Sequence, residues 1–121
     1  MKAELYDLLG SLGYEVYEQG SFTDEKEYPD SFFTVWNDDT VAHSHYDNVE
    51  TATTWEFTIY FYSTSPLLCV DVINIVKTLL QKNRWIVPGK GRDAASDAKS
   101  HSGRMIEAYF IEKNEEEKED E

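Results

Sequence analysis

The chain has 121 residues, a length that one modest hydrophobic core can stabilise as a single domain. Hydrophobic residues make up 40% of it and aromatic residues 14%, which is too apolar for a chain that is disordered throughout. Against 24 Asp and Glu there are 11 Lys and Arg, giving a formal net charge of −13. Because nucleic acids and anionic membranes attract proteins through Lys and Arg, this charge argues against both and favours other proteins as partners.

The first residues do not resemble a secretion signal. Acidic residues, Glu4 and Asp7, stand where a signal peptide carries basic and then apolar residues. No apolar run approaches the roughly 20 residues that are needed to span a bilayer. The single cysteine, Cys69, cannot form an internal disulfide, which fits a reducing cytosol. We therefore expect a protein that starts at Met1 and is made in the cytoplasm.

Part of the negative charge is concentrated at the C-terminus. Residues 112–121 hold seven acids and two lysines, a net −5, which leaves −8 for residues 1–111. We expect residues 1–111 to form a single α+β domain and residues 112–121 to be an acidic, disordered tail. The alternative is a tail that repels other anions or becomes ordered on a partner.

The chain opens with a predicted helix. Its leucines recur at helical spacing, at Leu5, Leu8, Leu9 and Leu12. Gly13 stands at a natural helix end, and residues 14–18 then have the composition of a strand. A polar loop that contains Pro29 follows.

Two strands are predicted next. Residues 32–36 are rich in β-formers and end at the turn residues 37–39, and the weak alternation of residues 40–47 is compatible with an extended arm. Residues 52–63 alternate clearly, with apolar side chains on one face and Tyr60 and Tyr62 on the other. Because tyrosine gives contact area at low entropic cost, that second face is expected to become an interface.

A second helix is predicted over residues 65–83. Ser65 is a good N-cap and Pro66 suits the first helical position. The expected buried stripe consists of Leu68, Val72, Ile75, Val76 and Leu79, with Leu80 beside it.

The chain ends with two more predicted strands. They cover residues 85–87 and 104–112, separated by a turn at residues 88–91 and a polar loop at residues 92–103. The element order is helix, three strands, helix, two strands. Segregated elements of this kind predict an α+β fold with a mainly antiparallel sheet of four or five strands packed by two helices.

Three groups of residues in the sequence have side chains that could form a chemical site. Gly89-Lys90-Gly91-Arg92 lacks the spacing of a phosphate-binding loop, so a plain turn is the better interpretation. Cys69 begins the second helix, but nothing nearby in the sequence supplies a base or an oxyanion hole.

The third group is a histidine cluster, formed by His43, Ser44, His45 and Asp47. His43 and His45 would share one face of a strand, but further zinc ligands would have to come from Asp38, Asp39 or His101 without a recognised spacing. An exposed polar arm is the better interpretation. We expect no catalytic residues, no metal, no cofactor and no enzymatic activity.

The run Trp85-Ile86-Val87-Pro88-Gly89-Lys90-Gly91-Arg92-Asp93 resembles the strand and turn after the second helix in tail terminator and tail-completion proteins of long-tailed bacteriophages. Residues 29–38, the long strand of residues 53–63 with its Ser65-Pro66 helix entry, and the closing strand of residues 105–111 are similar to theirs in the same order. The similarity extends over residues 1–112. The chain differs in the acidic loop at residues 24–30 and in its acidic tail.

This resemblance implies a virion protein at the head-proximal end of the tail. It would form a ring, commonly a hexamer, that caps the tail tube, ends tube polymerisation and provides a docking surface for the head connector. The implied partners are further copies of the chain, the tail tube protein and the connector. The residues expected to make protein contacts are Tyr60, Tyr62, Trp36, Trp85, Arg92 and Asp93.

Three alternatives stay open, of which one is an enzyme that uses His43, His45 and acidic residues. A head–tail connector or joining protein would have the same architecture and would also form a ring. A small cytosolic ligand-binding domain would instead hold a ligand between its sheet and its helices.

Overall fold

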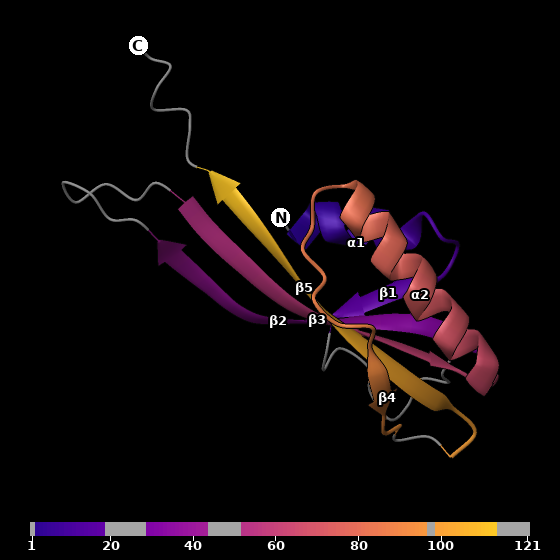
Figure 1. Ribbon diagram of the computed structural model, residues 1–121. Coiled ribbons are helices and arrows are strands. Elements are labelled where there is room, and N and C mark those ends of the chain that lie inside the picture. The colour runs from indigo at the N-terminus through magenta and orange to yellow at the C-terminus, as the bar shows by residue number, and fades with distance from the viewer. Residues whose placement is uncertain (1, 19–28, 44–51, 97–98, 114–121) are drawn as a thin grey trace, which may run out of the picture.

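The computed structural model describes residues 2–18, 29–43, 52–96 and 99–113. They form a five-stranded sheet in the order β1-β2-β3-β5-β4 and two helices (Figure 1). β1 runs parallel to β2, and every other neighbouring pair is antiparallel. The predicted α+β class with a mainly antiparallel sheet is therefore confirmed. In chain order the elements are α1 (Lys2–Gly10), β1 (Glu15–Glu18), β2 (Ser31–His43), β3 (Ala52–Ser63), α2 (Pro66–Lys82), β4 (Arg92–Ala94) and β5 (Ser102–Lys113).

Both helices lie on the same face of the sheet, and the core fills the space between them and the strands (Figure 1). The alternation of β3 decides which side chains enter it, so that Phe57, Ile59 and Phe61 are fully buried. From α1, the leucine stripe supplies Leu5 and Leu9, as expected from their spacing.

The start of α2 is as predicted, and its buried side is confirmed in part, at Val72, Val76 and Leu80. The Ser65 side chain accepts a hydrogen bond from the Leu68 backbone N–H, and Pro66 occupies the first turn. Ile75, which we expected in the buried stripe, is 50% exposed. The buried residues of this helix are Cys69, Val72, Ile73, Val76 and Leu80. Apolar residues surround α2 on more sides than the sheet can cover, so periodicity alone did not determine the contact line.

The predicted strand at residues 85–87 is reduced to one bridge, between Ile86 and Tyr109 of β5. Pro88, which has no N–H to donate, follows directly and limits further pairing. The fourth strand is instead β4, inside a segment that we expected to be a loop. Gly91 adopts φ +91° and turns the chain back onto β5, where Arg92 pairs with Met105.

Three strands continue beyond the helices. Figure 1 shows β2, β3 and β5 projecting together to one side of the helical layer. We call residues 39–43, 52–56 and 109–113, which pair with one another across these strands, the arm. The expected extension of the strand past residue 40 is present as far as His43, and the rest of that prediction, residues 44–47, lies outside the described residues.

Candidate interaction surface

The face of the sheet opposite the helices is rich in aromatic side chains. Because neighbouring residues of a strand point to opposite faces, the burial of Phe33 and Val35 under the helices assigns Phe32, Thr34 and Trp36 to the other face. Neither helix lies on this side (Figure 1). We call it the aromatic face, after its ring-bearing residues Tyr17, Phe32, Trp36, Tyr60 and Tyr62.

Most of these rings contact one another across strands. Tyr60 and Tyr62 are stacked with ring centroids 6.1 Å apart and an interplanar angle of 1°. The ring centroids of Tyr62 and Phe32 are 5.4 Å apart, and the Phe32 ring meets the Tyr17 ring edge-on at a centroid distance of 6.0 Å. The His101 ring also lies edge-on to Phe32, at 5.9 Å. The rings thus form a line across β1, β2 and β3 that holds each side chain in place.

Polar and exposed groups lie beside this line. Arg92 of β4 and Glu107 of β5 form an ion pair with a nitrogen–oxygen distance of 3.9 Å. A bulge in β2 between Asn37 and Asp39 places Asp38 where its carboxylate accepts a hydrogen bond from Thr58. Trp36, directly before the bulge, is 52% exposed and supplies the largest exposed ring area of this face.

The structure brings four of the six predicted contact residues onto this face. Trp36 pairs with Thr58, which pairs with Glu107, the partner of Arg92. Tyr60 of β3 pairs with Met105 of β5, and Met105 pairs in turn with Arg92 of β4. Together with Tyr62, these residues lie on one face of the sheet, where Phe32, Thr34 and Thr58 between them are themselves buried.

The other two predicted contact residues lie elsewhere. Trp85 is 3% exposed and packs in the core against Phe57 and Phe110, with centroid distances of 5.9 and 5.2 Å. Its burial removes it from the molecular surface. Asp93 is exposed but faces the helical side, where its carboxylate accepts a hydrogen bond from Arg104 at 2.9 Å.

Sequence reasoning missed Tyr17 and Phe32. The run Phe32-Phe33-Thr34-Val35-Trp36 has no polar alternation, so it did not show which rings share a face. Tyr17 joins the face through the parallel pairing of β1 with β2, a contact between distant parts of the chain that leaves no local pattern.

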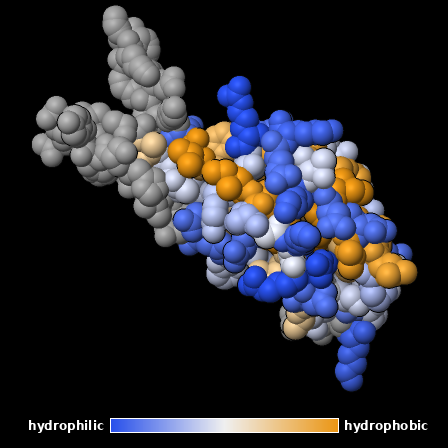
Figure 2. Space-filling view, in the orientation of Figure 1, coloured by the Kyte–Doolittle hydropathy of each residue, from blue (hydrophilic) through white to orange (hydrophobic). Residues whose placement is uncertain are grey.

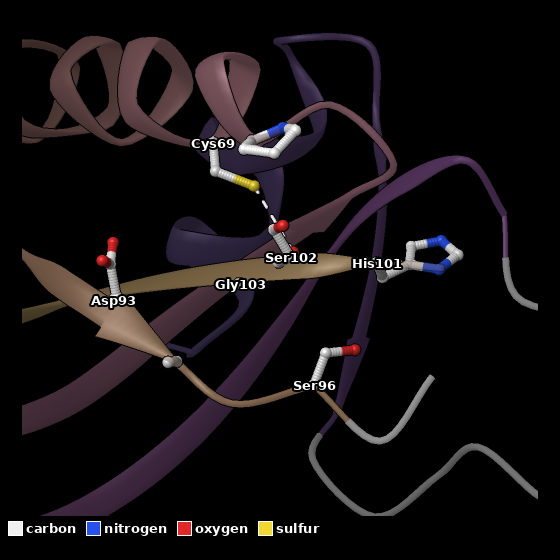
Figure 3. Close-up of a pocket in the computed structure, with 8 residues that line it drawn as sticks. Cys69, Asp93, Ser96, His101, Ser102 and Gly103 are labelled. Atoms are coloured by element: carbon white, nitrogen blue, oxygen red, sulfur yellow. Dashed lines mark hydrogen bonds between the residues drawn. The ribbon is translucent and has the colours of Figure 1, made fainter. Parts of the chain in front are cut away.

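A cleft of about 340 Å³ lies between the start of α2 and the β4–β5 end of the sheet (Figure 3). The Cys69 thiol lines it and donates a hydrogen bond to the Ser102 carbonyl oxygen at 3.4 Å. Burial raises the pKa of Cys69, which keeps the thiol protonated and poorly nucleophilic.

His101 lines the same cleft but does not serve as a base for Cys69. Its ring points away from the thiol (Figure 3). Its Nε2 lies 2.8 Å from the Pro29 carbonyl oxygen and its Nδ1 2.8 Å from the Ser100 hydroxyl. The two ring nitrogens therefore contact the Pro29 carbonyl and the Ser100 hydroxyl, and not the Cys69 thiol.

Two candidate sites remain from the sequence, the histidine cluster and the turn at residues 89–92. Within the described ranges, no group of three or more His, Cys, Asp and Glu side chains could hold a metal ion, while residues 44–47 of the histidine cluster fall outside those ranges. Residues 89–92 form a turn whose Gly89 carbonyl accepts a hydrogen bond from the Lys77 ammonium at 2.8 Å. No helix in the described part of the chain is long and apolar enough to cross a membrane.

Comparison with protein-family models and with curated proteins finds no match to this chain.

Proposed function

We propose that this chain is a structural protein of bacteriophage or prophage assembly, which caps the tail tube as a ring and offers a docking surface to the head connector. The observation that carries the proposal is the aromatic face, a sheet surface without helices on which Trp36, Tyr60 and Tyr62 lie together. The element order helix, three strands, helix, two strands is the order expected from the sequence, although the strand after α2 is residues 92–94 and not residues 85–87, which carry part of the resemblance.

The physical task of a capping ring fits such a surface. A tube subunit leaves a self-complementary surface at the growing end, and a cap must cover that surface without presenting another copy of it. The Tyr60 and Tyr62 rings supply contact area at little entropic cost, because neighbouring rings already restrict their rotamers.

The charge of the chain suits a passage for DNA. A ring of subunits that each carry −13 repels the phosphate backbone, so DNA can cross the opening without adhering to it.

A binding experiment with purified components tests the proposal. The chain is mixed with tail tubes formed by the tube protein of the phage or prophage that encodes it, and separately with the connector protein of the same phage. We expect it to bind tube ends. Binding to the connector alone would favour the joining-protein alternative, and binding to neither would contradict both roles.

Two variants connect that experiment to the aromatic face. Tyr60→Ala removes one ring of the stack and is expected to weaken tube binding at least about tenfold, as for a residue central to an interface. Leu67→Ala is the control, because Leu67 is 78% exposed on α2, away from this face. Equal binding by the two variants would assign the tube contact to another surface.

A further inference from the structure

In the arm, residues of β2 and of β5 pair with the same residues of β3, so the two outer strands extend equally far along it. Val41 pairs with Thr54 and Thr54 with Ile111, while His43 pairs with Ala52 and Ala52 with Lys113. Since β2 and β5 are both antiparallel to β3, they run in the same direction. β2 therefore forms one edge of the arm and β5 the other, side by side with β3 between them (Figure 1).

Within the described ranges, neither edge of the arm is paired over its full length. β1 pairs with β2 at residues 32–35, which leaves the outer side of residues 39–43 without a neighbouring strand in this part of the structure. β4 pairs with β5 at residues 103–105, and the Ile86 bridge lies at Tyr109. Beyond Tyr109, the outer side of β5 is likewise without a described neighbour.

The hydrogen bonds of the bridge reveal which backbone groups point outward. The Tyr109 N–H and carbonyl both bond to Ile86, at 2.9 and 2.8 Å, so they face away from β3. Because alternate residues of an antiparallel strand point to opposite sides, Ile111 and Lys113 also present their backbone groups outward. The same alternation, carried across the register through Thr54 and Val41, places the outward groups of β2 at Thr40 and Ala42.

Exposed apolar side chains accompany both edges. Ile86 and Ile111 on the β5 side are 47% and 48% exposed, and Trp36 on the β2 side is 52% exposed. The register places all three on the aromatic face, since Ile86 pairs with Tyr109, Ile111 with Thr54 and Trp36 with Thr58. Unpaired edges with apolar flanks readily accept another strand unless a partner covers them.

We propose that the arm joins copies of this chain by strand addition: the edge of β5 beyond Tyr109 in one copy pairs with the outer edge of β2 at residues 39–43 in the next. This inference rests on the proposed function and supplies the contact that would form its ring. The incoming copy also brings its Trp36 towards Ile86 on the same face.

The arm itself indicates that the occupant is a second copy. Its two edges, which have no neighbouring strand among the described residues, lie on opposite sides and run in the same direction, so a copy displaced sideways offers the edge that the first copy lacks. Such a contact is heterologous, because it uses two different surfaces, and its repetition closes a ring or extends a filament. A two-fold dimer would instead join like edges.

Cross-linking between two singly substituted chains tests this geometry. Val41→Cys in one tagged chain and Ile111→Cys in the other introduce cysteines at the same level of the two edges, because both positions pair with Thr54. A short bismaleimide is added at about 1 M salt, where a Debye length of about 3 Å screens the repulsion between acidic copies. The unsubstituted chain is the background control, because its Cys69 is 2% exposed.

We expect cross-links between the two different chains and few between identical ones. Cross-links mainly between two Val41→Cys chains or two Ile111→Cys chains would overturn the proposal in favour of like-edge pairing. Yields at the background level in every mixture would also overturn it, and would favour an extended segment of another protein as the occupant.

A proline variant tests the backbone contact separately. Ile111→Pro removes an outward N–H and leaves the bonds to β3 intact, so the monomer should keep its melting temperature. We expect the sedimentation-derived self-association to weaken at least about tenfold, whereas Ile111→Thr, which keeps the N–H, should lose less. Equal association by both variants would exclude strand addition.

The two proposals can fail independently. Tube binding without cross-links between the two edges would reject strand addition and retain the capping role. Cross-links between the edges in a chain that binds neither tube nor connector would retain strand addition and reject the viral function.

Discussion

Two tryptophans of this chain occupy opposite environments. Trp85 is 3% exposed and packs against Phe57 and Phe110, whereas Trp36 is 52% exposed at the end of the aromatic face. The buried indole N–H of Trp85 has no hydrogen-bond partner among the described residues, so part of the stability gained from packing is lost to desolvation of that group.

Substitution of the two tryptophans should separate core from surface. We expect Trp85→Ala to lower the free energy of unfolding by about 3–5 kcal/mol, and Trp36→Ala to change it by less than about 0.5 kcal/mol. Urea denaturation measures both values. Trp85→Phe should cost much less than Trp85→Ala, because it keeps a ring and removes the unpaired N–H. Similar losses for Trp36→Ala and Trp85→Ala would contradict the burial described above.

At the scale of elements, the turn before β4 depends on one glycine. Gly91 has φ +91°, and a Cβ there would lie 2.8 Å from the Met105 carbonyl oxygen and 3.0 Å from Ile73 Cγ2. Both the conformation and the space therefore require glycine. Gly10, at the end of α1, has nothing within 4 Å of a Cβ.

These two glycines give a matched test. Gly91→Ala should destabilise the protein by about 1–3 kcal/mol, since it combines an unfavourable backbone conformation with a backbone clash. Gly10→Ala should be neutral or stabilising by up to about 0.5 kcal/mol. Thermal melts of the two variants beside the parent protein measure the difference. A Gly91→Ala variant as stable as the parent would mean that β4 is not anchored by this turn.

Elements with a strong local signal were predictable from the sequence. The spacing of Leu5 and Leu9, the Ser65 cap and the alternation of residues 52–63 are confirmed, because each depends on neighbours a few residues away. The strand at residues 92–94 was missed because three residues carry no periodicity and their pairing depends on the Gly91 turn. In the same way, alternation placed Tyr60 and Tyr62 on one face, but nothing local showed that Trp85 would be drawn into the core.

At the scale of the whole molecule, the formal charge of −13 opposes compaction. Ion pairs formed by the described residues include Lys2–Glu18, Arg92–Glu107 and Arg104–Asp93. Each has at least one largely exposed partner, and exposed pairs contribute little to stability. Repulsion between like charges is therefore not balanced by these contacts.

Added salt should stabilise this protein. Raising the ionic strength from about 0.01 M to about 0.15 M shortens the Debye length from roughly 30 Å to roughly 8 Å and screens the repulsion. We expect the melting temperature to rise in differential scanning calorimetry, and to rise equally in sodium chloride and choline chloride. A rise in sodium chloride alone would indicate a bound cation, and a fall in both salts would show that attractive charge pairs dominate.

The strand order has a consequence for synthesis on the ribosome. β5, the last strand of this sheet in the chain, lies between β3 and β4 in the sheet. While β5 is still inside the exit tunnel, β3 lacks one neighbour and β4 lacks the strand on which it pairs, so the nascent chain exposes apolar strand edges until Lys113 has left the tunnel. Folding of this domain is therefore expected to be completed after its synthesis, and early release at any codon before Ser102 would yield a product that cannot complete its sheet.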